Sequence, residues 1–117
     1  MIPAKMKTDA RFSYPKLNLM KIILQTLDIK ASPALELLVE KNFRRLHELP
    51  VPIIRAEVIV GEDIVENLPG KFCNVRLITS DTDYLVAQRA ATVEKAIEAT
   101  AIELYKKIRK EYIRNNP

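Results

Sequence analysis

The sequence contains very few of the residues from which active sites and metal centres are usually built. It has one cysteine, Cys73, and one histidine, His47, too few for a disulfide framework or for a cysteine- or histidine-rich metal site. Its two glycines, Gly61 and Gly70, cannot supply a glycine-rich phosphate-binding loop. Tryptophan is absent and aromatic residues make up only 6%, so no stacking platform for single-stranded RNA is evident. We therefore predict a protein with no catalytic residues, no metal or other cofactor and no small-molecule substrate.

Long hydrophobic runs are missing too. No segment approaches the roughly 18 apolar residues of a membrane-spanning helix, and residues 1–19 lack the apolar stretch of a secretory signal peptide. The chain has 117 residues, of which 48% are hydrophobic and 29% charged, a balance typical of one soluble globular domain. We expect a cytoplasmic protein without a membrane partner.

Charge is present, and it is unevenly distributed. Nineteen basic and fifteen acidic residues give a net charge of +4. Residues 51–91 carry four basic and six acidic side chains, a balance of −2, whereas the densest basic cluster lies near the C-terminal end of the chain, at Lys106, Lys107, Arg109, Lys110 and Arg114. A localised basic cluster favours a polyanionic partner.

The hydrophobic pattern predicts six elements in the order β-α-β-β-β-α. Alternating residues predict strands at 20–29, 53–61, 71–79 and 84–91. Helical periodicity predicts helices from Pro33 to Leu49, where Pro50 follows, and from a Thr92 cap to about Arg114. Short turns make the last three strands an antiparallel meander. The fold class is α+β: a two-layer sandwich in which a four-stranded sheet carries both helices on one face.

The domain organisation follows from the same pattern. Residues 1–19 show no hydrophobic period and contain Pro3 and Pro15, so they are predicted to form a flexible or loosely docked basic N-terminal extension. Residues 20–117 form the single domain.

Two side chains with reactive chemistry each have a simpler interpretation. His47 falls beside Glu36 and Glu40 on the first predicted helix, which is a possible general-base arrangement. A solvated histidine near a helix C-terminus explains the same pattern without catalysis. Cys73 lies on the apolar side of its strand, so we expect a buried, inert thiol.

The helical cations give a stronger signal. Lys41, Arg44 and Arg45 fall on one flank of the first helix. On the last helix, Lys106 and Lys110 lie opposite the buried stripe, while Arg109 borders that outer side. If the helices pack side by side, these groups form one surface suited to phosphate contacts with structured RNA. The alternative is an ordinary solvated face whose cations complement the helix dipole.

Four segments together carry a family resemblance: MKIILQTLDI at 20–29, SPALELLVEKNFRRL at 32–46, NVRL at 74–77 and TVEKAIEATAIELYKKIRK at 92–110. In this order they resemble the ribosome hibernation-promoting factor family, also called the ribosome-associated inhibitor or sigma-factor modulation family. The resemblance covers about residues 20–114. Because the chain ends just after the last helix, it resembles the short type within that family.

The resemblance implies a fold similar to double-stranded-RNA-binding domains. It also implies a non-enzymatic, stress-related translation inhibitor that sits on the small ribosomal subunit near the decoding region, with ribosomal RNA as its ligand. The RNA-binding residues implied by position are Lys41, Arg45, Lys106, Arg109 and Lys110. Arg44 and Lys107 are added as RNA-binding candidates from local charge alone.

Other functions remain open from the residues themselves. A general binder of structured RNA would share the fold and lack a ribosomal site. A protein-interaction module, such as a modulator of a transcription regulator, would use the exposed sheet face at Arg55, Glu57, Asn74 and Arg76. A small enzyme dependent on His47 is the last alternative.

Overall fold

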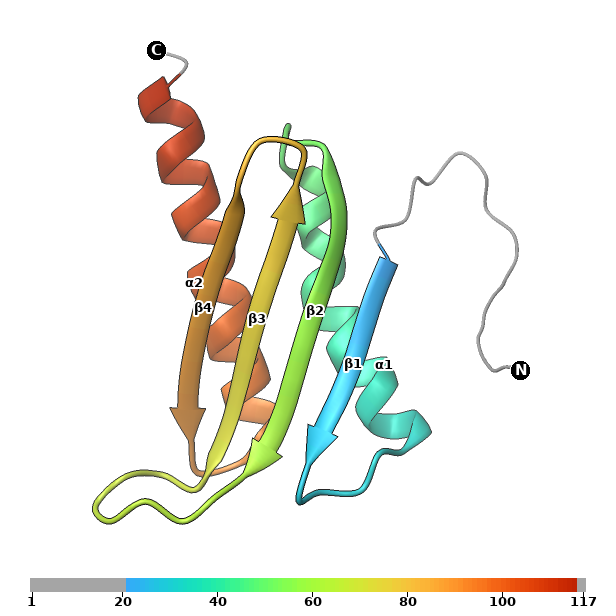
Figure 1. The fold of residues 1–117 in the computed structure, drawn as a ribbon, viewed down its shortest axis with the longest axis vertical. Helices are drawn as coiled ribbons and strands as arrows, with labels where there is room; N and C mark the ends of the chain where they lie inside the picture. The colour runs from blue at the N-terminus through green and yellow to red at the C-terminus, as the bar shows by residue number, and fades with distance from the viewer. Residues whose placement is uncertain (1–20, 116–117) are drawn as a thin grey trace.

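The computed structural model describes residues 21–115 as one layer of sheet and one layer of helices (Figure 1). The elements follow one another as β1 (Lys21–Leu27), α1 (Pro33–Phe43), the 3₁₀ helix η2 (Arg44–Glu48), β2 (Ile53–Glu62), β3 (Lys71–Thr79), β4 (Asp83–Ala90) and α2 (Val93–Asn115). The predicted α+β class and β-α-β-β-β-α order are confirmed. The extension predicted at residues 1–19 lies outside the described residues. No helix within the described range is long and apolar enough to cross a membrane.

The four strands form one sheet in the order β1-β2-β3-β4. The antiparallel pairs β2–β3 and β3–β4 confirm the predicted meander. β1 pairs with β2 in parallel, an arrangement that requires a crossover, and α1 with η2 supplies it. Both helical segments therefore lie behind the sheet in Figure 1, with α1 behind β1 and β2 and α2 behind β3 and β4.

The first helix begins where the sequence predicted and ends earlier. The Ser32 hydroxyl accepts the backbone N–H of Leu35 at 3.1 Å, and Pro33 occupies the first turn. The prediction of one helix over 33–49 is wrong in its second part, because the α-helix ends at Phe43 and η2 follows. Phe43, Leu46 and Leu49 are all buried. Their spacing of three residues suits the tighter 3₁₀ winding, which keeps positions i and i+3 on one side.

The second helix carries the larger share of the core. The Thr92 hydroxyl accepts the backbone N–H of Lys95 at 3.1 Å, as a helix cap does. The stripe along its inner side is buried at Ile97, Thr100, Ala101, Leu104 and Ile108. Within it the Thr100 hydroxyl lies within hydrogen-bond distance of the carbonyl oxygens of Ala96 (2.8 Å) and Cys73 (3.1 Å), which share its single proton, so the one polar side chain in the stripe has partners.

The predicted burial of Cys73 is confirmed. Its side chain is enclosed between the sheet and α2. Burial raises the pKa of the Cys73 thiol to about 11, because removal from water disfavours the thiolate; a hydrogen bond with Thr100 offsets only part of this rise. A thiol with that pKa holds no appreciable thiolate at neutral pH and is inert.

The opposite face of the sheet is not covered by any described element (Figure 1). We call it the open face. Strand register places fifteen side chains on it in four rows across the strands, in addition to Gly61. They are Lys21, Ile23, Gln25, Leu27, Arg55, Glu57, Ile59, Phe72, Asn74, Arg76, Ile78, Asp83, Leu85, Ala87 and Arg89.

One corner of the open face is closed by the ring of Phe72. Gly61 lies between Leu27 and Phe72 in register. A Cβ at Gly61 would stand 2.7 Å from the Phe72 ring and 2.7 Å from the Leu27 carbonyl oxygen, so only glycine lets the ring lie across β2. The Arg89 guanidinium covers the ring at 5.7 Å from its centroid and pairs with Asp63 at 2.6 Å. This corner is therefore already filled.

Candidate nucleic-acid interface

The two helical segments are joined on their outer side by one side-chain contact. The Arg45 guanidinium of η2 lies 4.7 Å from the centroid of the Tyr105 ring on α2. This cation–π contact keeps the charge of Arg45 next to α2, one helical turn before Arg109. Arg45 of the first helical segment therefore lies beside α2.

The predicted cations of α2 form a compact group. Lys106, Arg109 and Lys110 are exposed and, with Ile113, line a shallow hollow of about 330 Å³. Spacings of three and four residues place all four on one side of the helix. Among the described residues, none of these three cations forms an ion pair. Their charge is therefore available to an anionic ligand.

The remaining cations of the first helical segment differ from one another. Lys41 is exposed in the last turn of α1 and has no ion pair within residues 21–115. Arg44 pairs with Glu40 one turn earlier, with 3.5 Å between nitrogen and oxygen. Both side chains of that pair are more than half exposed, so the attraction is modest. It still draws Arg44 along α1, whereas Arg45 reaches toward α2.

The structure separates Lys107 from its neighbours. The Lys107 ammonium donates to the Leu85 carbonyl oxygen at 3.2 Å, on the free edge of β4. Lys107 follows Lys106 by one residue, about 100° around the helix, so the two point to different sides of α2. A lysine ammonium held against the free edge of a strand also discourages strand pairing with other chains. We name Lys41, Arg45, Lys106, Arg109 and Lys110 the helical basic surface; Lys107 and Arg44 stand outside it.

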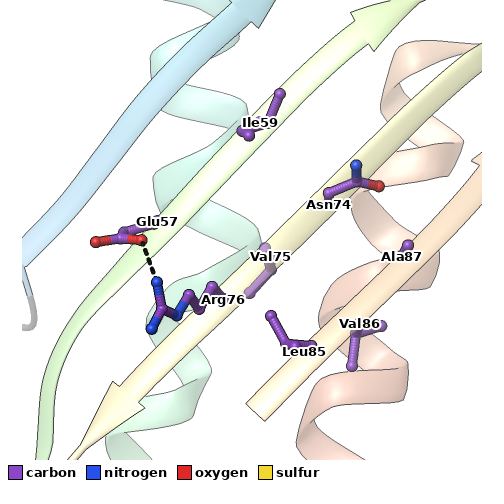
Figure 2. A pocket seen from close by; sticks show the side chains of 8 residues that line it. All are labelled: Glu57, Ile59, Asn74, Val75, Arg76, Leu85, Val86 and Ala87. Atoms are coloured by element: carbon purple, nitrogen blue, oxygen red, sulfur yellow. Dashed lines mark ion pairs between the residues drawn. The ribbon is translucent and has the colours of Figure 1, made fainter. Parts of the chain in front are cut away.

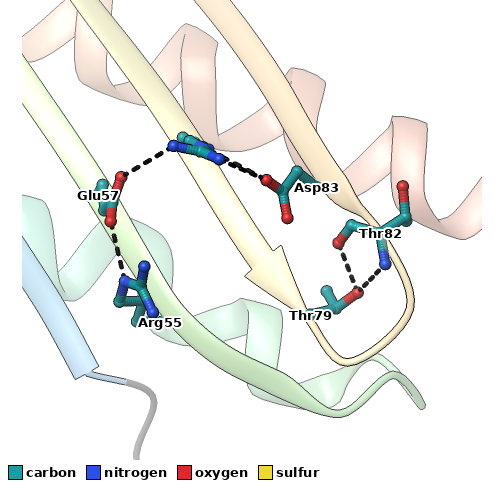
Figure 3. Close-up of polar contacts among 6 residues, drawn as sticks. Arg55, Glu57, Thr79, Thr82 and Asp83 are labelled. Carbon is teal, nitrogen blue, oxygen red and sulfur yellow. Dashed lines mark hydrogen bonds and ion pairs between the residues drawn. The ribbon is translucent and has the colours of Figure 1, made fainter.

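The arginines of the open face are in the opposite electrostatic state (Figure 3). Arg55 donates to Glu57 at 2.9 Å, and Arg76 pairs with Asp83 at 2.8 Å and with Glu57 at 3.9 Å. The hydrogen bond and charge of Asp83 raise the pKa of Arg76. Four charged groups thus neutralise one another across β2, β3 and the start of β4.

The turn beside this network is fixed by Thr79. Its hydroxyl donates to the Thr82 carbonyl oxygen at 2.7 Å and accepts the backbone N–H groups of Asp81 and Thr82 (Figure 3). These bonds set the direction in which β4 leaves β3. They explain why Asp83 lies opposite Ile78 in register, within reach of Arg76.

His47 lies near the end of η2 with an exposed side chain, which agrees with the simpler of its two interpretations. Partial burial and the charge of Arg44 lower the pKa of His47, whereas a general base paired with a carboxylate would have a raised pKa. Tyr105 was missed, and its only sequence signal is an aromatic side chain bordering the buried stripe. Residues 21–115 contain no cluster of three or more side chains suited to a metal ion.

The fold and the site define a class of protein: a small α+β domain with a basic helical surface on one side and, on the other, a sheet on which Arg55 and Arg76 are paired with carboxylates. The family model described as "Sigma 54 modulation protein / S30EA ribosomal protein" matches residues 22–115, so the chain belongs to this family of ribosome-associated proteins. The resemblance found in the sequence is thereby confirmed. A comparison with curated proteins gives no match.

Two solved structures share the fold. A ribosomal subunit interface protein from Coxiella burnetii has a TM-score of 0.67 and 18% identity, and the match covers 80% of this chain and 99% of that one. The N-terminal domain of Protein Y from Thermus thermophilus has a TM-score of 0.67 and 17% identity over 78% of this chain and 98% of the other.

Proposed function

We propose that this protein is a non-enzymatic, cytoplasmic translation inhibitor that binds the small ribosomal subunit near the decoding region through the helical basic surface. The observation that carries the proposal is the group of exposed cations at Lys106, Arg109 and Lys110, which form no ion pair within residues 21–115. Arg45 lies beside them through its contact with Tyr105. Family membership supports the ribosome as partner. The structural neighbour from Coxiella burnetii, a ribosomal subunit interface protein, agrees with that partner.

The physical basis is recognition of ribosomal RNA through its phosphates. Cations that carry no ion pair lose no internal partner when they meet phosphates, and they release counterions from the RNA. Such contacts read the shape of the RNA backbone rather than its bases. A rigid surface of five cations on packed helices therefore suits a folded RNA site, and a protein seated there would exclude other ligands of the decoding region.

The test is sucrose-gradient sedimentation of the purified protein with bacterial ribosomes. The unmodified protein is expected to migrate with the small subunit and with whole ribosomes. The double variant Lys106→Glu/Lys110→Glu is expected to lose more than about 100-fold in affinity, because two attractive phosphate contacts become repulsive. A matched control, Lys30→Glu/Lys95→Glu, makes the same change in net charge at exposed positions outside the surface. The control is expected to bind nearly as the unmodified protein does.

Salt supplies a second measurement. With about five phosphate contacts, affinity should fall on the order of 100-fold between about 50 and about 200 mM salt. Competition with free duplex RNA separates a ribosomal site from general RNA binding: an excess of duplex should displace little of the ribosome-bound protein. If the charge-reversed variant sediments with ribosomes as the unmodified chain does, the helical basic surface is not the binding site.

A further inference from the structure

The open face is the largest surface of the fold that the proposed function does not use. Exposed apolar side chains stand on its outer strands: Leu85 on β4 is 65% exposed and Ile23 on β1 is 42% exposed, and Ala87 on β4 is also exposed. Between β2 and β4, Leu85 and Ala87 line a hollow of about 460 Å³ together with Ile59 and Asn74. Figure 2 shows Ile59, Asn74 and Leu85 around it, with the Glu57–Arg76 ion pair at one end.

We propose that residues 12–19 of this chain fold back over the open face and place the side chains of Phe12 and Tyr14 in this hollow. Residues 1–20 lie outside the described part of the chain, and they join the sheet at Lys21, the first residue of the edge strand β1. The segment directly before that point is rich in apolar side chains: Phe12, Tyr14, Leu17, Leu19 and Met20.

The length of the segment allows this contact. The hollow lies two to three strands from β1, about 10–14 Å across the sheet, and about three residues, or 10 Å, along it. The direct distance from Lys21 is then roughly 15 Å. Tyr14 precedes Lys21 by seven residues, and seven extended residues span up to about 23 Å. The aromatic side chains therefore reach the hollow with chain to spare.

The size of the open face favours a tethered segment over a second copy of the protein. Four strands at about 4.8 Å spacing and about 25 Å in length give a face of about 500 Å². Stable dimers bury about 800 Å² on each partner. Part of the face is also closed, because Phe72 and Arg89 fill one corner. A segment of the same chain meets the face at an effective concentration near the millimolar range, so a small contact suffices.

The polar groups of the face suit an extended peptide. The charges of Arg55, Glu57, Arg76 and Asp83 are already paired, so an apolar segment laid beside them separates no ion pair. The side-chain amide of Asn74 is exposed at the middle of the hollow, with no hydrogen bond to another described residue. An amide offers one acceptor and two donors to a peptide backbone passing over it. The helical basic surface stays free, because it lies on the other side of the sheet.

The test measures access to a thiol introduced on the open face by Leu85→Cys. Cys73 is buried and has its pKa raised to about 11, so the introduced thiol is the one that alkylating reagents reach. We compare the full chain carrying L85C with the same chain carrying L85C and Phe12→Ser/Tyr14→Ser. A docked segment is expected to slow alkylation at least about tenfold, which requires a peptide affinity of about 0.1 mM at an effective concentration near 1 mM.

The control places the thiol at Ile102→Cys, which is 45% exposed on α2, away from the open face. Its alkylation rate should not change with the Phe12/Tyr14 substitutions. Equal rates at L85C with and without those substitutions would overturn the proposal. Protection that grows with protein concentration would overturn it in favour of a second copy on the face. Ribosome sedimentation of the Phe12→Ser/Tyr14→Ser chain should stay unchanged. The docking of residues 12–19 and the proposed ribosome binding are therefore tested independently of each other.

Discussion

The two sides of this molecule hold their cations in opposite states. On the helical side, Lys106, Arg109 and Lys110 have no ion pair within the described residues. On the open face, Arg55 and Arg76 are bound to carboxylates of the same sheet. The net charge of +4 therefore does not show how the available positive charge is distributed: the helical side offers more of it to a ligand than the open face does. Pairing, rather than the count of basic residues, decides which surface can attract a polyanion.

The two faces of the sheet also differ in their exposure to solvent. Leu104, packed between α2 and the sheet, is fully buried, whereas Leu85 on the open face is 65% exposed. The same residue type thus stands in two environments: Leu104 holds the two layers together, and Leu85 projects from the uncovered face of the sheet. Paired substitutions can measure this difference directly.

The largest expected effect comes from truncating the same side chain on each face. Leu104→Ala should lower the free energy of unfolding by about 2–5 kcal/mol, because it removes buried methyl groups and leaves a cavity. Leu85→Ala should cost less than about 0.5 kcal/mol if water alone covers the open face. Urea denaturation of both variants gives the comparison. A cost above about 1 kcal/mol for Leu85→Ala would instead mean that the open face is covered.

Burial of the Cys73 thiol between the sheet and α2 makes the stability of the fold depend on pH. Its pKa is about 11 in the folded protein, above the ordinary value near 9. The unfolded chain therefore loses this proton first, and stability should fall as pH rises from about 9 to about 11. The expected loss is about 1.4 kcal/mol per pH unit, or roughly 2–3 kcal/mol in all.

The measurement is urea denaturation at several pH values, with Cys73→Ala as the control. Burial and the charge of Glu111 raise the pKa of Tyr84 as well, which adds a loss of the same sign in both proteins. The difference between the two proteins in the slope of unfolding free energy against pH is therefore due to Cys73. Parallel slopes would show that the thiol is not enclosed as the structure has it.

Much of this fold could be predicted because the pattern and the caps agree. Alternation in β2 and β3 and the capping residues Ser32 and Thr92 gave the element order and the helix starts. The end of the first helix could not be predicted, because residues spaced by three fit a 3₁₀ helix and the flank of an α-helix equally well. The parallel pairing of β1 also depends on tertiary packing, and no local pattern specifies it.

The candidate site was predictable to the level of helix faces. Spacing placed Lys106 and Lys110 on the outer side of α2, where the structure has them. It could not show that Arg45 contacts Tyr105, since that contact joins two elements sixty residues apart. Lys107 is next to Lys106 in the sequence, but it points to a different side of α2. Local charge along the sequence therefore placed it wrongly with the other cations.

A smaller effect is expected where the two helical segments meet. Tyr105→Leu keeps an apolar side chain against the helices and removes the ring that holds Arg45. Affinity for ribosomes should fall about two- to fivefold, the equivalent of about 0.5–1 kcal/mol for one cation–π contact. Sedimentation titrations measure it, and Tyr105→Phe, which keeps the ring, should bind as the unmodified protein does. Equal affinities for the leucine and phenylalanine variants would show that the ring does not position Arg45.

The smallest effect should come from the open face, where an arginine is removed from its ion pairs. Arg76→Ala is expected to leave the urea midpoint of unfolding nearly unchanged, because the Arg76–Asp83 pair is exposed. It should leave the salt dependence of ribosome binding unchanged. Arg109→Ala removes the same charge from the helical basic surface and should lower the slope of log affinity against log salt by about 0.7–0.9. If Arg76→Ala lowers that slope as much as Arg109→Ala does, paired arginines exchange carboxylates for phosphates at little cost. The distinction between the two sides would then lie in shape rather than in charge.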